Sequence, residues 1–360
     1  MNNRWAHKDG STLRTNSVHS RWRPPLVRLL GKRVIKFASA KSMIILTLTA
    51  VTAWFPAEAQ QPPPKVSRIG FLRAVACIKE TDLFLGLREL GYTEGQNLVI
   101  ECRTSFGKGE LPDLAAELVR LNVDVLVSEG TKTTLAAKQA TKVIPIVMVY
   151  VGDPVASGIA NSLARPGSNV TGLSANLNEM ITKHLEILKE VAPRISRVAL
   201  LMDSTNIGQT LLAEQLDVAA RVMNVRVQRL DVLTPAALDG SFALALRERA
   251  EAFIVLPLPA LGPPDVRRIT EFAVNNRVLT MTYNTPYFDA GMLMLYGPNI
   301  PDQYRRVGGY IDKILKGAKP TDLPIQQPTK IDFIINQRTA RALRVKIPES
   351  LLERADQIIN

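Results

Sequence analysis

The sequence predicts an α/β protein with two adjacent lobes, each built on its own parallel sheet. Short, nearly continuous apolar runs alternate with amphipathic stretches of helical period, which is typical of βαβ units whose strands are buried on both faces. This alternation runs through one set, pauses near residues 171–176 and starts again. With 360 residues, 46% of them hydrophobic and 22% charged, the chain is long enough for two domains and apolar enough for their cores.

The first set follows a proline-rich stretch and contains four predicted strands and three helices. The apolar runs predict strands at residues 66–72, 98–103, 123–127 and 144–150. The stretches between them predict helices at 81–90, 111–121 and 133–141. Gly91 ends the first of these helices, and Pro112 lies in the first turn of the second, where proline is tolerated.

The second set begins with a strongly amphipathic helix. Predicted helices lie at 178–191, 208–223, 238–250 and 265–275, and predicted strands at 197–202, 225–230, 252–257 and 278–282. The C-terminal part adds an apolar run at 292–296, a helix at 302–315, an extended stretch at 324–335 and short helices at 337–343 and within 347–359. A strand and a helix after the second set are typical of a chain that crosses back to its first lobe. We therefore expect lobe one at 66–173 plus about 285–324, and lobe two at 174–284 plus about 325–360.

The net charge of +12 is concentrated at the N-terminus. Residues 1–59 carry ten Lys and Arg and two acidic residues, which is a net +8 of that total. The rest of the chain is only slightly basic and has no stripe of Lys and Arg, so no nucleic-acid partner is predicted.

Residues 1–59 are predicted to be a cleaved signal peptide with a long basic N-terminal extension. Basic residues precede the apolar run 42–55, and Ala57-Glu58-Ala59 supplies the small-x-small pattern for cleavage before Gln60. The alternative is a membrane anchor, but this run is shorter than the roughly 20 residues that a spanning helix needs. No cysteine for a lipid anchor lies at the cleavage site, and residues 60–65 are predicted to be a linker. The sequence thus predicts a periplasmic protein with no stable membrane anchor.

Two cysteines, Cys77 and Cys102, lie near the ends of the first two predicted strands. An oxidising compartment permits a disulfide, and strands that are commonly neighbours favour one. Two unpaired thiols are the alternative.

No motif in the chain predicts catalysis, a cofactor or a metal. After residue 59 the one histidine is His184, in the middle of a predicted helix, where a structural role is expected. No H-E-x-x-H, paired C-x-x-C, G-x-S-x-G or Walker pattern occurs. The protein is therefore not expected to be an enzyme.

The loops that follow the strands form the predicted ligand site. In open parallel sheets, ligands bind in the crevice outside the carboxyl ends of the strands. The candidate residues are Arg73, Ser128, Glu129, Gly130, Thr131, Tyr150, Asp153, Ser174, Asp203, Ser204, Thr205, Asn206 and Tyr283.

Two of these loops allow two interpretations each. Residues 128–131 lead into a helix, so their hydroxyls and N–H groups form either an anion or carboxylate site or an ordinary N-cap by Thr131 or Thr133. Asp153, before Pro154, is either the cap of a helix that begins at the proline or the acceptor of a ligand ammonium. The capping role is favoured for Asp153.

Several segments resemble the ABC transporter substrate-binding proteins related to aromatic amino-acid binders. They are Ile69-Gly70-Phe71-Leu72, Leu90-Gly91-Tyr92 with Gly95-Gln96-Asn97, Gly152-Asp153-Pro154-Val155, the run 162–172 (SLARPGSNVTG), Gln327-Pro328-Thr329-Lys330 and the run 347–356. The resemblance covers nearly the whole predicted exported body. It implies the type I periplasmic-binding fold, with two Rossmann-like lobes joined by a three-crossing hinge.

The resemblance also implies a function. We expect a protein that binds a small molecule, such as an amino acid or related organic acid, closes on it at the hinge, and delivers it to ABC permease and ATPase subunits encoded elsewhere. A sensory protein that presents its ligand to a membrane receptor and, less favoured, an exported α/β enzyme are the alternatives. Four features depart from the family: Glu129 within Ser128-Glu129-Gly130, Ser168 in place of glycine, Arg73 and Cys77. Arg73, Cys77 and Glu129 bear on the identity of the ligand.

Overall fold

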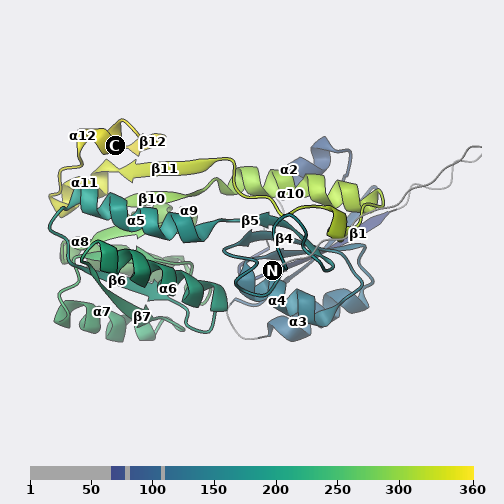
Figure 1. The fold of residues 1–360 in the computed structure, drawn as a ribbon, viewed down its shortest axis with the longest axis horizontal. Helices are drawn as coiled ribbons and strands as arrows, with labels where there is room; N and C mark the ends of the chain where they lie inside the picture. The colour runs from purple at the N-terminus through teal and green to yellow at the C-terminus, as the bar shows by residue number, and fades with distance from the viewer. Residues whose placement is uncertain (1–65, 78–81, 107–109) are drawn as a thin grey trace, which may run out of the picture. The chain divides into compact units, whose positions relative to one another are not determined.

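The computed structural model describes residues 66–77, 82–106 and 110–360, and the predicted signal peptide and linker lie outside them. The described residues form a five-stranded sheet of order β2-β1-β3-β4-β5 and a seven-stranded sheet of order β12-β11-β10-β9-β8-β6-β7 (Figure 1). Neighbouring strands in this part of the chain run parallel, except β10 and β11, which are antiparallel. The predicted α/β class with two mainly parallel sheets is confirmed.

The first sheet, with the helices packed on it, is lobe one. Its strands are β1 (Ser67–Arg73), β2 (Leu98–Thr104), β3 (Val125–Glu129), β4 (Ile146–Val151) and β5 (Val170–Ser174). Helices α2 (Asp82–Glu89) and α10 (Ile300–Leu315) bury apolar side chains on one face, and α3 (Leu111–Arg120) and α4 (Thr131–Ala140) on the other. Helices α2 and α10 approach closely at Gly86, where an added Cβ would lie 2.7 Å from the carbonyl oxygen of Arg305.

The second sheet and its helices form lobe two. Its strands are β6 (Arg197–Met202), β7 (Arg226–Asp231), β8 (Ala252–Val255), β9 (Leu279–Thr282), β10 (Met294–Pro298), β11 (Ile331–Asn336) and β12 (Gln357–Ile359). One face packs against α5 (Leu177–Val191), α6 (Ile207–Val222), α11 (Gln337–Leu343) and α12 (Glu349–Leu352). The other packs against α7 (Ala237–Arg247), α8 (Pro263–Asn275) and α9 (Thr285–Asp289).

The structure places two segments differently from the sequence prediction. The chain was expected to return to lobe one at about residue 285, but β10 pairs with β9 and β11, so lobe two continues through Pro298. The helix that returns is α10, because its apolar face is buried against the first sheet. The joining segment also contains a fifth strand, β5, beside β4. At Gly172 (φ 129°) an added Cβ would lie 2.1 Å from the carbonyl oxygen of Met148, so only glycine fits that pairing.

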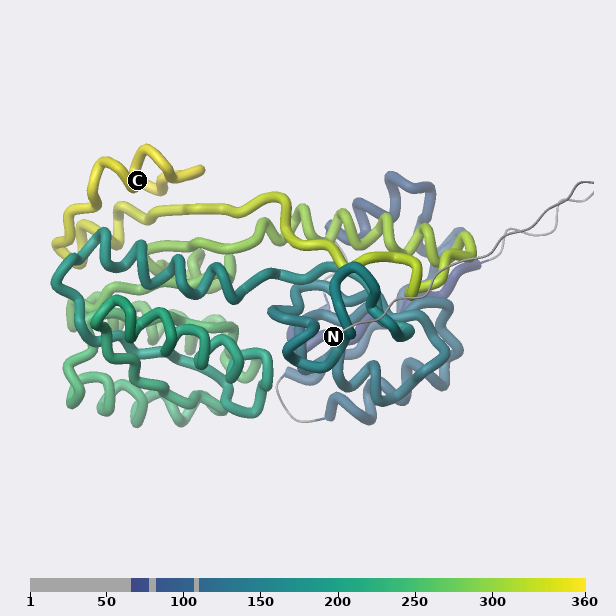
Figure 2. Tube along the Cα trace, viewed as in Figure 1, coloured from purple at the N-terminus to yellow at the C-terminus, as the bar shows by residue number. Residues whose placement is uncertain are grey.

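Within the described residues the chain crosses between the lobes three times (Figure 2). The crossings follow β5, follow β10, and lie between the short 3-10 helix η2 (Pro320–Asp322) and β11. The third is hydrogen-bonded to both others. Gln326 N donates to Gly172 O and Gln326 O accepts from Ser174 N, while Lys330 O accepts from Asn299 N. In this part of the chain, no helix is both long and apolar enough to span a membrane.

Candidate functional site

The carboxyl ends of the strands of lobe one bring several predicted residues to one edge. Leu72 pairs with Ser128, Glu129 with Val149, and Val151 with Ser174. Arg73, Glu129 and Tyr150 therefore end neighbouring strands. Because the strands are parallel, their carboxyl ends all lie at the same edge of the sheet, as the sequence predicted.

Arg73 and Glu129 form an ion pair at this edge. Nε of Arg73 donates to Oε2 of Glu129 at 2.5 Å, and the side chains are 8% and 21% exposed. The guanidinium also donates to Ala76 O at 2.8 Å and to the Tyr304 hydroxyl at 3.4 Å. Its carbon lies 5.1 Å from the ring centre of Phe71 and 5.9 Å from that of Tyr304. Arg73 is thus held on every side by lobe one and presents the carboxylate of Glu129.

Burial and charge act together on the titratable groups of this cluster. Burial lowers the pKa of Arg73, but Glu129 and Tyr304 outweigh that effect and the pKa is raised overall. The pKa of Tyr304 is raised by burial first and then by the charge of Glu129. Burial likewise raises the pKa of Tyr150, with contributions from Tyr283 and Glu129. At neutral pH the arginine is charged and both tyrosines are protonated donors.

A disulfide joins Cys77 to Cys102, across 25 positions of the chain. Cys102 lies on β2 beside Phe71 of β1, and Cys77 immediately follows Ala76. The bridge therefore ties the loop after β1 to the sheet, next to the carbonyl that accepts from Arg73.

The start of α4 has no side-chain N-cap, so the predicted capping by Thr131 or Thr133 is wrong, and the anion or carboxylate site stays a prediction. Ser128 Oγ bonds to Thr134 Oγ1 at 2.8 Å, and the Thr133 and Thr134 hydroxyls donate to the backbone carbonyls of residues 129 and 130. The residue before the helix is Gly130 (φ 87°), which supplies no side-chain cap. The hydroxyls of Ser128, Thr133 and Thr134 are thus engaged inside lobe one. The backbone N–H groups, Thr131 and Lys132 are what the start of this helix can offer an anion.

Asp153 closes a turn in this structure, and the predicted helix beginning at Pro154 does not form, because residues 154–158 are turns. Its Oδ1 accepts from the backbone N–H of Val155 and Ala156, both at 2.9 Å. Its Oδ2 accepts from Asn178 Nδ2 at 2.8 Å. These three hydrogen bonds occupy most of the acceptor capacity of the carboxylate, and its role as the acceptor of a ligand ammonium stays a prediction.

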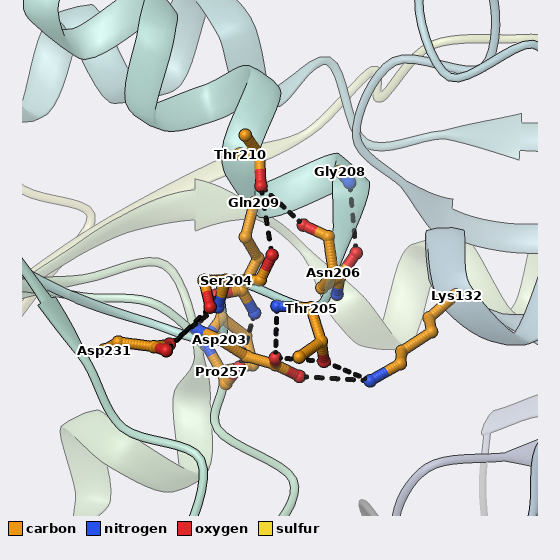
Figure 3. A network of polar contacts seen from close by, with 10 residues as sticks. All are labelled: Lys132, Asp203, Ser204, Thr205, Asn206, Gly208, Gln209, Thr210, Asp231 and Pro257. Carbon is orange, nitrogen blue, oxygen red and sulfur yellow. Dashed lines mark hydrogen bonds and ion pairs between the residues drawn. The ribbon is translucent and has the colours of Figure 1, made fainter. Parts of the chain in front are cut away.

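The facing edge of lobe two is a network of polar side chains after β6 (Figure 3). Asp203 Oδ1 accepts from both the backbone N–H and the hydroxyl of Thr205, while Ser204 donates to Asp231. Asn206 caps α6 by accepting from Gly208 N at 3.1 Å. The four predicted residues 203–206 therefore form one ordered loop.

Three contacts join the strand-end loops of the two lobes. Lys132 Nζ, on α4, lies 2.6 Å from Thr205 Oγ1 and 3.4 Å from Asp203 Oδ2 (Figure 3). Beside it, an added Cβ on Gly208 would lie 2.5 Å from Thr131 Oγ1. The Tyr150 hydroxyl donates to the carbonyl oxygen of Tyr283 at 3.0 Å.

Two of the five buried side-chain polar atoms that lack a hydrogen-bond partner among the described residues belong to residues near these contacts. Gln303, on α10, donates to Ser174 O, yet its own side-chain oxygen has no hydrogen-bond partner among the described residues. The side-chain oxygen of Asn284, next to Tyr283, is in the same situation within those residues. Buried acceptors of this kind call for a donor, such as water or a ligand, beyond the described residues.

Sequence reasoning missed Lys132, Gln303 and Tyr304. Lys132 lies between the predicted loop 128–131 and the predicted helix 133–141, and this position directly after a strand-end loop is a usable signal. Tyr304 lies 231 positions from Arg73, and nothing local in the sequence links the two.

His184 is a fully buried structural residue. Its Nε2 lies 2.6 Å from Tyr296 O, and burial lowers its pKa to about 4. A neutral imidazole enclosed by Tyr283 and Tyr296 has no access to a substrate proton. No group of three or more His, Cys, Asp or Glu among the described side chains is placed to hold a metal.

A separate groove of about 330 Å³ lies on lobe two. It is lined by Lys183, Ile187, Tyr296, Ile331, Phe333, Arg354 and Asp356. Lys183 pairs with Glu186 and Arg354 with Glu190. Because its cations are already paired, this groove is a weaker candidate than the facing strand ends.

Comparison with known proteins identifies the relatives of this chain. The family model described as ABC transporter substrate binding protein matches residues 73–359. The tyrosine-binding protein of Clostridioides difficile (strain R20291) is 25% identical over 260 residues, which are 71% of this chain and 74% of that protein. A conserved domain protein from Vibrio cholerae is 26% identical, with a TM-score of 0.74 over 82% of this chain and 100% of that one. A Streptococcus pneumoniae ABC domain in complex with L-Trp has a similar fold, with 24% identity and a TM-score of 0.71 over 81% of this chain and 99% of that one.

Proposed function

Since the chain belongs to the ABC transporter substrate-binding protein family, we propose that it captures an amino acid between its two lobes outside the cytoplasm and delivers it to an ABC importer. Binding would shift the chain from an open to a closed arrangement, and the membrane subunits would recognise the closed one. The ligand would leave chemically unchanged.

The observation that carries this proposal is the meeting of strand ends from both lobes. Loops of lobe one and lobe two contact each other at Lys132 and Thr205, and again at Tyr150 and Tyr283. A molecule held at these edges contacts both lobes at once, so its binding energy favours their approach.

Three features support an amino acid as the ligand class. The edge carries paired charges at Arg73 and Glu129. The aromatic rings of Tyr150 and Tyr283 lie with centres 5.9 Å apart at the contact between the lobes. The names of two relatives specify tyrosine and L-Trp.

The test is a thermal-shift screen of the purified chain, lacking residues 1–59, against the amino acids and related organic acids. Calorimetry on the hits then gives their affinities. We expect saturable one-to-one binding of at least one amino acid, which is recovered unaltered. A purified, folded chain that binds none of them would overturn the proposal.

Export and delivery have their own tests. Mass spectrometry of the protein secreted by its host is expected to give an N-terminus at Gln60. A strain that lacks the chain is expected to lose uptake of the labelled amino acid. Normal uptake in that strain would favour the sensory alternative.

A further inference from the structure

We propose that Glu129 receives the ammonium group of the ligand and that Arg73 is the residue that positions it; this inference rests on the proposed function. It narrows the ligand to molecules that carry both an amine and a carboxylate. Related organic acids without an amine are then excluded.

The geometry separates the roles of the two residues. Arg73 makes three kinds of contact inside lobe one, to Glu129, Ala76 and Tyr304, and its side chain is 8% exposed. Glu129 ends β3 at the edge of the sheet where the ligand is proposed to bind, and its side chain is 21% exposed. The guanidinium therefore lies behind the carboxylate, where it fixes the orientation of Glu129 without facing the ligand.

Charge balance then selects a zwitterion. Arg73 is the one ion-pair partner of Glu129 among the described residues, so the pair is neutral as a unit. A ligand with equal positive and negative charge preserves that neutrality. A net anion would lie against the carboxylate of Glu129, whose partner Arg73 is already paired. The amine of Lys132 already faces Asp203. Like charges brought together in a partly buried site are costly.

Two buried acceptors of residues near the contacts between the lobes suit an ammonium. An ammonium has three N–H donors, and the buried side-chain oxygens of Gln303 and Asn284 have no donor within the described part of the chain. Gln303 precedes Tyr304, which contacts Arg73, and donates to Ser174 at the same edge. Asp153 has less acceptor capacity left, because its carboxylate already accepts three hydrogen bonds.

The experiment compares matched ligands on matched variants. L-tyrosine and L-tryptophan are titrated into the chain beside the same molecules without the amine, 3-(4-hydroxyphenyl)propanoate and indole-3-propanoate. We expect the natural chain to bind at least one amino acid about tenfold or more tightly than its deamino partner. Glu129→Gln should remove that preference, since a hydrogen bond to a charged group is typically worth about a tenfold change or more.

Two further variants separate positioning from folding. Arg73→Met should reduce the preference for the amine, and Arg73→Lys should restore part of it. In the Glu129→Gln background, Arg73→Met should cause no further loss of preference, because there is no carboxylate to position. Glu117→Gln, which breaks a comparable pair with Arg103 in lobe one, is the control and should leave the preference unchanged.

The outcomes are distinguishable. If the amino acid binds but Glu129→Gln weakens both ligands of a pair equally, the ammonium assignment is wrong and the proposed function stands. The same holds if the deamino acid binds as tightly as the amino acid. If no ligand of either kind binds the folded chain, the proposed function fails and this inference fails with it.

Discussion

Lys132 and Thr205 lie on different lobes, and Nζ of the lysine is 2.6 Å from Oγ1 of the threonine. Asp203 accepts from that same threonine hydroxyl and lies 3.4 Å from the amine. The three side chains form a bridge between the strand ends. The lysine side chain is 36% exposed, so water screens this bridge and limits it to roughly 0.5–1 kcal/mol.

Removing this bridge should weaken ligand binding slightly. Lys132→Met is expected to lower the apparent affinity by about two- to fivefold, because the proposed closure on the ligand would proceed without this contact between the lobes. Calorimetry at low and at 0.5 M salt measures the effect, and high salt should shrink it. Lys316→Met is the control, since Lys316 pairs with Asp312 within α10. An equal loss in both variants would count against a bridge that acts between the lobes.

Gly208 allows a second test of the contact between the lobes. In Gly208→Ala the new Cβ would lie 2.5 Å from Thr131 Oγ1, so the lobes cannot approach as seen here. Ligand affinity should fall about tenfold or more with little change in Tm, because the clash is absent when the lobes are apart. Adding Thr131→Ala should restore part of the affinity. Gly240→Ala on α7, where the added Cβ meets nothing within 4 Å, should behave like the natural chain.

The disulfide should contribute to both stability and binding. Closing a loop across 25 positions is worth about 3 kcal/mol in the chain-entropy model. Replacing Cys77 and Cys102 together by serine should lower the urea midpoint. It should also weaken ligand binding severalfold, because Ala76, which accepts from Arg73, is released. Unchanged affinity would mean that Phe71 and Tyr304 suffice to hold Arg73.

His184 should make the free energy of unfolding depend on pH in the acidic range. Its pKa of about 4 in the folded chain lies below the ordinary value of about 6.5, so the folded state binds fewer protons than the unfolded state. The free energy of unfolding should therefore fall as the pH drops from about 6.5 to about 4, by up to roughly 3 kcal/mol. Urea titrations of the natural chain and of His184→Gln measure this, since glutamine keeps an N–H for Tyr296 but does not titrate. Equal pH slopes would show that His184 does not contribute.

Much of the fold could be predicted from the sequence, because the spacing of apolar residues indicates each strand and helix and their order along the chain indicates βαβ units. The four strands and three helices predicted for lobe one are present, and the strand-end rule brought Arg73, Glu129 and Tyr150 to one edge. The short strand β5 was missed because five residues around a glycine give no clear pattern. The apolar run 292–296 overlaps the strand β10 (Met294–Pro298), but nothing in its composition specifies which of two sheets it joins.

The contacts within the site were harder to predict. Ser128 has the residue type and position for a ligand contact, yet its hydroxyl bonds to Thr134. Whether such a hydroxyl bonds to a ligand or to a residue of the following helix depends on where the first turn of that helix lies. The sequence does not specify that position. Tyr304 reaches Arg73 only because α10 crosses back between the lobes, so its role depends on the whole topology.

The hydrogen bonds among the three crossings have a mechanical consequence. The segment with Gln326 and Lys330 is bonded to the crossing after β5 and to the crossing after β10. Three crossing segments without mutual hydrogen bonds would let the lobes twist and slide against each other. Three crossing segments that are hydrogen-bonded side by side act as one hinge that bends about a single axis. Each approach of the lobes would then follow the same path and bring Lys132 to the same threonine, so the outer surface offered to another protein is the same after every closure.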